Sequence, residues 1–91
     1  MNKELNIEKW LKTYLGNLIE VESDSINIER TFDSYGLDSL DAIELISSLE
    51  EHLEKDLDIK ILDKYKTIKL LTVYLESIYK VPQAKEKKIL D

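Results

Sequence analysis

Ser39 stands in a stretch whose residue types could support chemistry at an exposed hydroxyl. The stretch is Gly36-Leu37-Asp38-Ser39-Leu40, in which a conformationally permissive glycine precedes a short acidic residue and a serine. Asp38 is a favourable N-cap, because its carboxylate can accept hydrogen bonds from the free N–H groups of a first helical turn. Ser39 is therefore predicted at the first position of a helix, where an attached anion would lie near the positive end of the helix dipole.

The hydroxyl of Ser39 lacks the neighbouring base that a catalytic serine needs. His52 is the only histidine, and it lies more than three turns along the same predicted helix. The pattern favours a serine that another enzyme modifies over an enzyme with Ser39 as its nucleophile. We therefore predict no catalytic residue in this chain, and His52 is predicted as a surface residue.

The residues after Ser39 repeat apolar side chains with the period of a helix. At 100° per residue these side chains occupy roughly a third of the circumference, and they predict a helix from Ser39 to Leu53 or Glu54. The stripe comprises Ala42, Leu45, Ile46, Leu49 and Leu53. Leu40 and Ile43 lie outside the stripe beside acidic side chains, which favours a docking surface for partner proteins over isolated exposed apolar residues. The residues assigned to this docking surface are Leu40, Asp41, Ile43, Glu44, Ser47 and Glu51.

A further helix is predicted near each end of the chain. The first begins at Asn2 or Asn6, ends at Ile19 or Val21, and has the apolar positions Ile7, Trp10, Leu11, Tyr14, Leu15 and Leu18. Trp10 and Tyr14 are interpreted as core residues, and Gly16 is expected to cost this helix roughly 1 kcal/mol relative to alanine. The last helix is capped by Thr67, ends before Pro82, and has the core stripe Ile68, Leu71, Leu75, Ile78 and Tyr79.

The segments between these helices have weaker signals. The long connection over residues 22–37 is expected to be pinned by Ile26, Ile28 and Phe32. Residues 59–65 could form one or two turns of helix or a short extended piece. Together these elements predict an all-α, four-helix bundle with a long first loop and a short third helix.

The composition of the 91-residue chain restricts its compartment and its partners. Residues 33–58 contain nine acids and one lysine, so they would repel nucleic acid and attract basic protein surfaces. Asp33, Asp38 and Asp41 lack the spacing of a calcium loop, and no metal site is predicted. The absence of cysteine suits a reducing compartment, and no apolar run is long enough to span a membrane. We predict a complete, freestanding, monomeric protein of the cytoplasm that contacts neither membrane nor nucleic acid.

The stretch Tyr35-Gly36-Leu37-Asp38-Ser39-Leu40-Asp41-Ala42-Ile43-Glu44-Leu45 resembles the attachment motif of acyl carrier proteins, most closely the polyketide-synthase type. The similarity runs from about Ile7 to Tyr79. In that family the serine of Asp-Ser-Leu carries 4′-phosphopantetheine, transferred from coenzyme A, whose thiol holds acyl groups as thioesters. The resemblance implies attachment at Ser39. It also implies that Asp38 supports attachment, because the aspartate before the serine is associated with the transferase's magnesium.

The resemblance implies a carrier domain over residues 1–81, and we expect residues 82–91 to form a flexible tail. Such a carrier delivers acyl groups between enzymes of polyketide, fatty-acid or related biosynthesis. Its implied partners are a phosphopantetheinyl transferase, an acyl-loading ligase or acyltransferase, and a synthase or transferase that receives the acyl group. Two alternatives stay open: a peptidyl carrier that holds an aminoacyl group, and an unmodified acidic helical adaptor.

The chain departs from the family pattern at two places after the predicted second helix. Glu54-Lys55 stands where a glycine commonly follows the last leucine of that helix. Lys66 stands where a proline commonly precedes the threonine that opens the last helix. Both departures blur the limits of the third segment, and neither affects the attachment motif.

Overall fold

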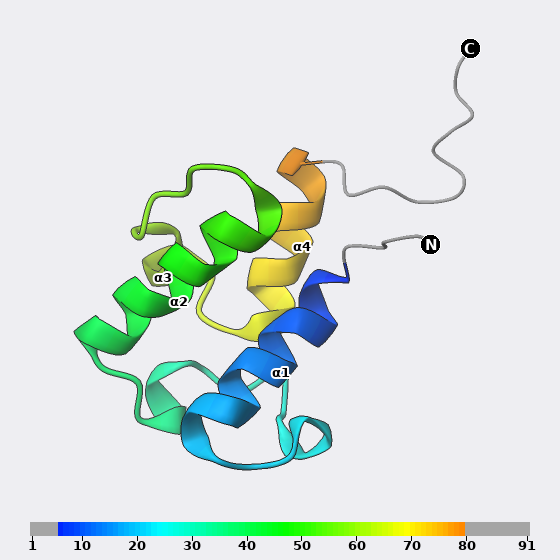
Figure 1. Cartoon of the computed structure of the whole chain (residues 1–91), viewed down its shortest axis with the longest axis vertical. Helices are drawn as coiled ribbons and strands as arrows, with labels where there is room; N and C mark the ends of the chain where they lie inside the picture. Colours follow the sequence, from blue (N-terminus) through cyan, green and yellow to red (C-terminus); the bar gives the residue numbers. More distant parts are fainter. Residues whose placement is uncertain (1–5, 80–91) are drawn as a thin grey trace.

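The computed structural model describes residues 6–79, which form four helices joined by irregular segments (Figure 1). The helices are α1 (Ile7–Ile19), α2 (Ser39–Leu53), the one-turn α3 (Ile61–Lys64) and α4 (Ile68–Tyr79). Two 3₁₀ turns, Ser23–Ser25 and Asp33–Tyr35, lie in the connection between α1 and α2. The predicted all-α fold with a long first loop and a short third helix is confirmed. Within the described residues, every helix is too short or too polar to cross a membrane.

The core lies where the apolar stripes of α1, α2 and α4 meet, with α1 and α4 side by side (Figure 1). Each of these helices contributes buried side chains three or four residues apart, as the sequence period predicts. They are Ile7, Leu11 and Leu15 of α1, Leu45, Leu49 and Leu53 of α2, and Ile68, Leu71 and Leu75 of α4. Ile26 and Phe32 reach the same core from the long connection, and Ile28 packs against it, which confirms the predicted pins.

The end of α1 shows why Gly16 lies within the helix. Asn6 caps the other end by accepting a hydrogen bond from the Lys9 N–H at 2.9 Å, and the chain leaves the helix through Glu20 in the left-handed region at φ 65°. The chain then folds back against Gly16, where an added Cβ would lie 2.7 Å from the Val21 carbonyl oxygen. Besides the predicted cost in helix propensity, Gly16 therefore meets a packing requirement, because this position has no room for a side chain.

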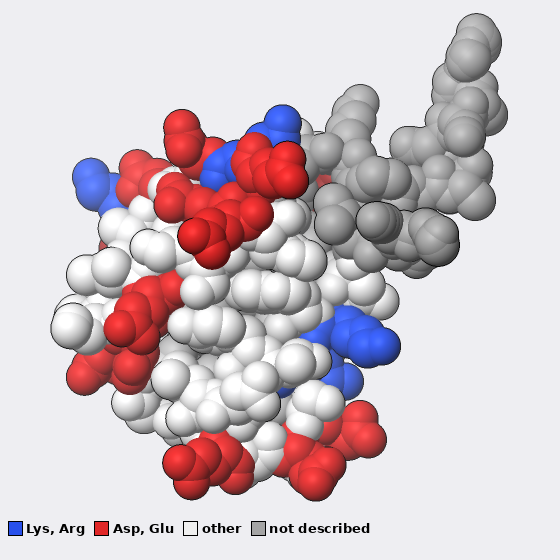
Figure 2. Space-filling view, viewed as in Figure 1, with Lys and Arg blue, Asp and Glu red and all other residues white. Residues whose placement is uncertain are grey.

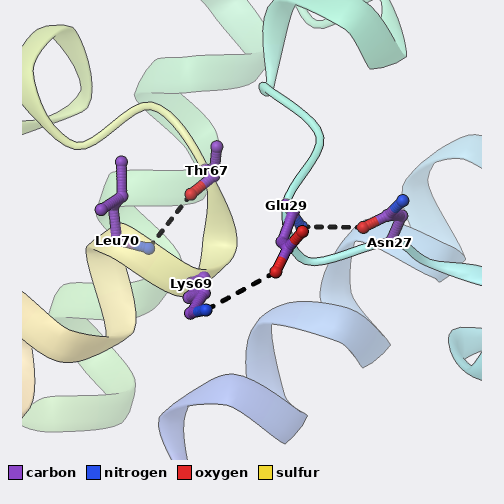
Figure 3. Close-up of polar contacts among 5 residues, drawn as sticks. All are labelled: Asn27, Glu29, Thr67, Lys69 and Leu70. Atoms are coloured by element: carbon purple, nitrogen blue, oxygen red, sulfur yellow. Dashed lines mark hydrogen bonds and ion pairs between the residues drawn. The ribbon is translucent and has the colours of Figure 1, made fainter.

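The long connection is joined by its backbone to the start of α4. The Phe32 N–H donates to the Lys66 carbonyl at 2.9 Å, and the Lys69 N–H donates to the Ile28 carbonyl at 3.0 Å. The hydroxyl of Thr67 accepts from the Leu70 N–H at 3.1 Å, which confirms Thr67 as the cap of α4. Figure 3 shows this junction, including the ion pair of 3.5 Å between Lys69 and Glu29. Two free N–H groups of the first turn of α4 are thus satisfied, one of them by the loop.

The C-terminal end of α4 differs in part from the prediction. Ile78 was assigned to the core stripe of α4, but its side chain is 42% exposed, so that assignment is wrong. The last turn of α4 extends beyond the described start of α1 in Figure 1. A side chain in this turn can lie on the core-facing side of α4 and still be exposed, because α1 does not reach far enough to cover it. The side chain of Tyr79, the stop at Pro82 and the tail 82–91 lie outside the described residues.

Candidate functional site

The start of α2 is built by a reciprocal pair of side-chain caps. Gly36 takes φ 87° after the turn Asp33–Tyr35, and its N–H donates to the Asp33 carbonyl at 2.9 Å. The Asp38 carboxylate then accepts from the Asp41 N–H at 2.9 Å, while the Asp41 carboxylate accepts from the Asp38 N–H at 3.1 Å. This is a capping box in which aspartate replaces the usual glutamate. It confirms Asp38 as the N-cap and places Ser39 at the first helical position.

Ser39 is exposed, and its hydroxyl makes no hydrogen bond to another residue of the described range 6–79. A pocket of about 410 Å³ lies beside it, between the long connection, α2 and α3. The apolar side chains of this pocket are Phe32, Leu37, Ala42 and Leu62. Its charged side chains are Asp33, Asp38, Asp63 and Lys66. Ala42 is half-buried and faces this pocket, so the predicted stripe of α2 is fully buried only from Leu45 onwards.

Tyr35 and Arg30 connect parts of the loop that precedes Ser39. The Tyr35 hydroxyl accepts from the Asn27 N–H at 2.7 Å and donates to the Asn27 carbonyl at 3.1 Å. The Arg30 guanidinium lies 4.4 Å from the centre of the Tyr35 ring and donates to the Ser34 carbonyl at 2.8 Å. These contacts close the chain between residues 27 and 35 on itself. These contacts therefore hold in place the residues that immediately precede Gly36 and the cap of α2.

The predicted docking residues lie on or near the outer face of α2. Leu40 is 57% exposed and Ile43 is 51% exposed, and the acidic or polar members Glu44, Ser47 and Glu51 are exposed as well. Asp41 differs, because it is half-buried and its carboxylate turns back to the cap. In Figure 2 acidic side chains gather near both ends of α2. The structure thus brings the predicted surface together around a small apolar centre of Leu40 and Ile43.

His52 has a different environment from the one predicted. It is half-buried, and its ring stacks on Trp10 with the ring centres 5.1 Å apart. Trp10 in turn stacks on Tyr14 at 5.3 Å, so the three rings cover the seam between α1 and α2. His52 lies in the last turn of α2 and is partly exposed, as predicted, but its contact with the Trp10 ring of α1 has no signal in the sequence of α2. Trp10 and Tyr14 pack against the core and are themselves half-buried.

Lys66 is one of several residues of this pocket that were not predicted from the sequence as site residues. It appeared there only as a departure from the family pattern, yet it lines the pocket next to Ser39. The sequence feature that could have indicated its role is a lysine in place of the usual proline, just before the last helix. No acidic cluster with metal-binding geometry occurs among residues 6–79.

Comparison with known proteins assigns the family. A family model described as "Phosphopantetheine attachment site" matches residues 9–75. An acyl carrier protein of Clostridium perfringens is 38% identical over 66 residues, which cover 71% of this chain and 87% of that protein. The polyketide synthase PksL of Bacillus subtilis is 28% identical over 72 residues, which cover 79% of this chain and 2% of that much longer protein.

Two solved structures share the fold. The acyl carrier protein Asl1650 from Anabaena sp. PCC 7120 has a TM-score of 0.77 and 34% identity, with 80% of this chain and 83% of that chain covered. A free-standing peptidyl carrier protein from Acinetobacter baumannii has a TM-score of 0.74 and 32% identity, with 84% and 96% covered.

The fold and the start of α2 define a small helical carrier domain of the kind that bears a covalent 4′-phosphopantetheine group. The chain belongs to the acyl carrier protein family. Members of this family are not themselves catalytic, and they interact with synthase enzymes. The residues at the start of α2 fit the group: Ser39 is exposed at a helix N-terminus, its hydroxyl makes no hydrogen bond within the described range 6–79, and a pocket with apolar and polar walls adjoins it.

Proposed function

We propose that Ser39 is the attachment residue and that the chain carries acyl groups between enzymes of polyketide, fatty-acid or related biosynthesis. The observation that carries this proposal is that Ser39 is exposed at the first position of α2, with no hydrogen-bond partner for its hydroxyl among residues 6–79. When bound, the phosphopantetheine arm supplies a thiol that holds the acyl group as a thioester. We propose no catalytic activity for the chain itself, since the only histidine, His52, lies in the last turn of α2, at the opposite end of the helix from Ser39.

Asp38 has two tasks in this proposal. One carboxylate oxygen, Oδ1, accepts from the Asp41 N–H and holds Ser39 at the start of the helix. Asp38 is exposed, and its other oxygen, Oδ2, has no hydrogen-bond partner among the described residues. It is therefore free to approach the magnesium of the transferase, the role that the family resemblance gives to this aspartate.

Partner enzymes are proposed to dock on the outer face of α2. The apolar centre of Leu40 and Ile43 can be covered by a partner, while Glu44 and Glu51 guide basic surfaces towards it. Ser47 lies between them on the same face. The partners are the phosphopantetheinyl transferase, a loading ligase or acyltransferase, and the synthase or transferase that receives the acyl group. We propose that a monomer does this work in the cytoplasm, a reducing compartment that suits a chain without cysteine.

A peptidyl carrier is the second candidate, and one observation favours it. The chain is 32% identical to the free-standing peptidyl carrier protein of Acinetobacter baumannii, a value close to its identity with acyl carriers. The two functions differ in the loading enzyme, which activates an acyl group in one case and an amino acid in the other. Incubation of the phosphopantetheinylated protein with each class of enzyme, followed by intact mass, would separate them.

Attachment at Ser39 is tested by incubating the protein with coenzyme A and a phosphopantetheinyl transferase. Intact mass should increase by one phosphopantetheine in the wild type and remain unchanged in Ser39→Ala. Ser48→Ala is the matched control, because Ser48 is a half-buried serine further along the same helix, and it should be modified like the wild type. Modification of Ser39→Ala, or no modification of the wild type while a known carrier reacts, would contradict the proposal.

A further inference from the structure

The pocket next to Ser39 contains one positive charge among several negative ones. Its acidic side chains are Asp33, Asp38 and Asp63, and its cation is Lys66. A phosphodiester attached to Ser39 would add a further negative charge to these surroundings. The N-terminus of α2 favours an anion, but Asp38 and Asp41 already occupy part of its first turn through the capping box. Lys66 is therefore the side chain of this pocket that can offset the added charge.

The backbone of Lys66 is fixed relative to the loop that leads to Ser39. Its carbonyl accepts from the Phe32 N–H at 2.9 Å, and the next residue, Thr67, forms an isolated antiparallel bridge with Thr31. Phe32 is buried in the core, so this junction cannot shift easily. The backbone that bears the Lys66 side chain is therefore held in place beside the pocket that this side chain lines.

No residue that the structure describes competes for the side chain of Lys66. It is exposed and forms no ion pair with a residue of the described range 6–79. Lys69, three residues further along, offers a contrast: it pairs with Glu29 at 3.5 Å, as Figure 3 shows, and does not line the pocket. The two lysines are thus close in sequence but differ in what they face.

We propose that Lys66 is a positioning residue that pairs with the phosphodiester of the attached arm and holds the beginning of the arm over the pocket. The inference rests on the proposed attachment at Ser39. A lysine ammonium is a compact charge on a flexible stem, which suits a phosphodiester anion without a fixed geometry. Because the pair is exposed to solvent, salt should weaken it, since the Debye length falls from about 30 Å at 0.01 M to about 10 Å at 0.1 M.

The experiment compares unmodified and phosphopantetheinylated forms of the wild type, Lys66→Gln, Lys66→Arg and Lys69→Gln. Two quantities are measured at low salt: the ³¹P chemical shift of the phosphodiester, and the change in Tm on modification. We expect Lys66→Gln to shift the ³¹P resonance. We also expect it to lower the change in Tm by about 1–8 °C, the range that corresponds to an exposed ion pair in a small domain.

Lys66→Arg should restore both values, and Lys69→Gln should leave both unchanged. The unmodified forms of wild type and Lys66→Gln should have the same Tm. If Lys66 contributed only to folding, the Tm of the unmodified forms would already differ. Equal ³¹P shifts and equal changes in Tm for wild type and Lys66→Gln would overturn the inference about Lys66 while leaving attachment intact. A wild-type protein that gains no mass would overturn attachment and the inference together, so the two failures are distinguishable.

Discussion

At the scale of single residues, the backbone conformation of a few positions decides how the helices end. Glu20 and Glu54 both take the left-handed region, at φ 65° and 58°, immediately after α1 and α2. Glycine usually fills such positions, and a residue with a side chain costs about 1–2 kcal/mol there. After α2 the turn is held by Glu50, whose carboxylate accepts from the Leu57 N–H at 2.7 Å. This contact accounts for a turn without the usual glycine.

Gly16→Ala should destabilise the domain, although alanine is the better helix former. The added methyl group would lie 2.7 Å from the Val21 carbonyl oxygen and 3.3 Å from the Ser23 nitrogen, and both atoms belong to the backbone. We expect a loss of about 1–3 kcal/mol in the free energy of unfolding, the range for overpacking. Urea unfolding measures it, with Asn17→Ala as the control, because Asn17 is the exposed next residue. Equal stability of the two variants would contradict this prediction.

At the scale of elements, α2 separates its tasks by face. Leu49 is fully buried, at 0% exposed, whereas Ile43 on the adjacent face is 51% exposed. One face therefore anchors the helix in the core, and the other is available to partners. The cap at Asp38 fixes where α2 begins. Ser39 therefore keeps the same position on the helix relative to the exposed face.

Leu49→Ala should lower the stability of the domain, whereas Ile43→Asp should impair its modification. Truncation of the buried leucine should cost about 2–5 kcal/mol, a large part of the stability of a small domain. Ile43→Asp should leave Tm nearly unchanged and slow modification by the transferase, because a charge is unfavourable at the dry centre of an interface. Thermal melts and a modification assay measure both. An Ile43→Asp variant that unfolds, beside a stable Leu49→Ala variant, would show that the two faces are assigned wrongly.

The elements that could be predicted from the sequence are those with a local signature. The stripes of α1, α2 and α4 follow from apolar spacing, and the caps at Asn6, Asp38 and Thr67 follow from residue type. Contacts between distant segments have no such signature. The bonds from the loop to α4, the lack of space at Gly16, the ring of Trp10 on His52 and the place of Lys66 in the pocket all depend on tertiary packing. For the same reason the sequence predicts the helix start at Asp38 and Ser39 but not the pocket beside it.

At the scale of the whole molecule, charge is distributed unevenly. The full chain carries a net charge of −6, and residues 33–58, which include α2, are far more acidic than this average. On the face seen in Figure 2, acidic side chains lie near both ends of α2 and also at the lower end of the molecule. A surface of this kind accelerates encounters with basic partners and contributes less to the lifetime of the complex.

Association with the transferase should weaken as salt rises from low to physiological ionic strength, because exposed charges are screened beyond about 8–10 Å there. Glu44→Lys should slow association more than it speeds dissociation. Glu76→Lys is the matched control, since it makes the same change of charge at an exposed site on α4. Stopped-flow binding measures both rate constants. Binding that does not respond to salt, or equal effects of the two variants, would contradict steering by α2.

The stack of Trp10 on His52 gives the protein an intrinsic optical probe. Trp10 is the only tryptophan, and its indole touches a ring from each of the two helices whose seam it covers. Its fluorescence therefore reports the separation of α1 and α2 without an added dye. A titration with a partner enzyme that lacks tryptophan can thus distinguish rigid docking on α2, which leaves the emission spectrum unchanged, from a complex in which the bundle opens.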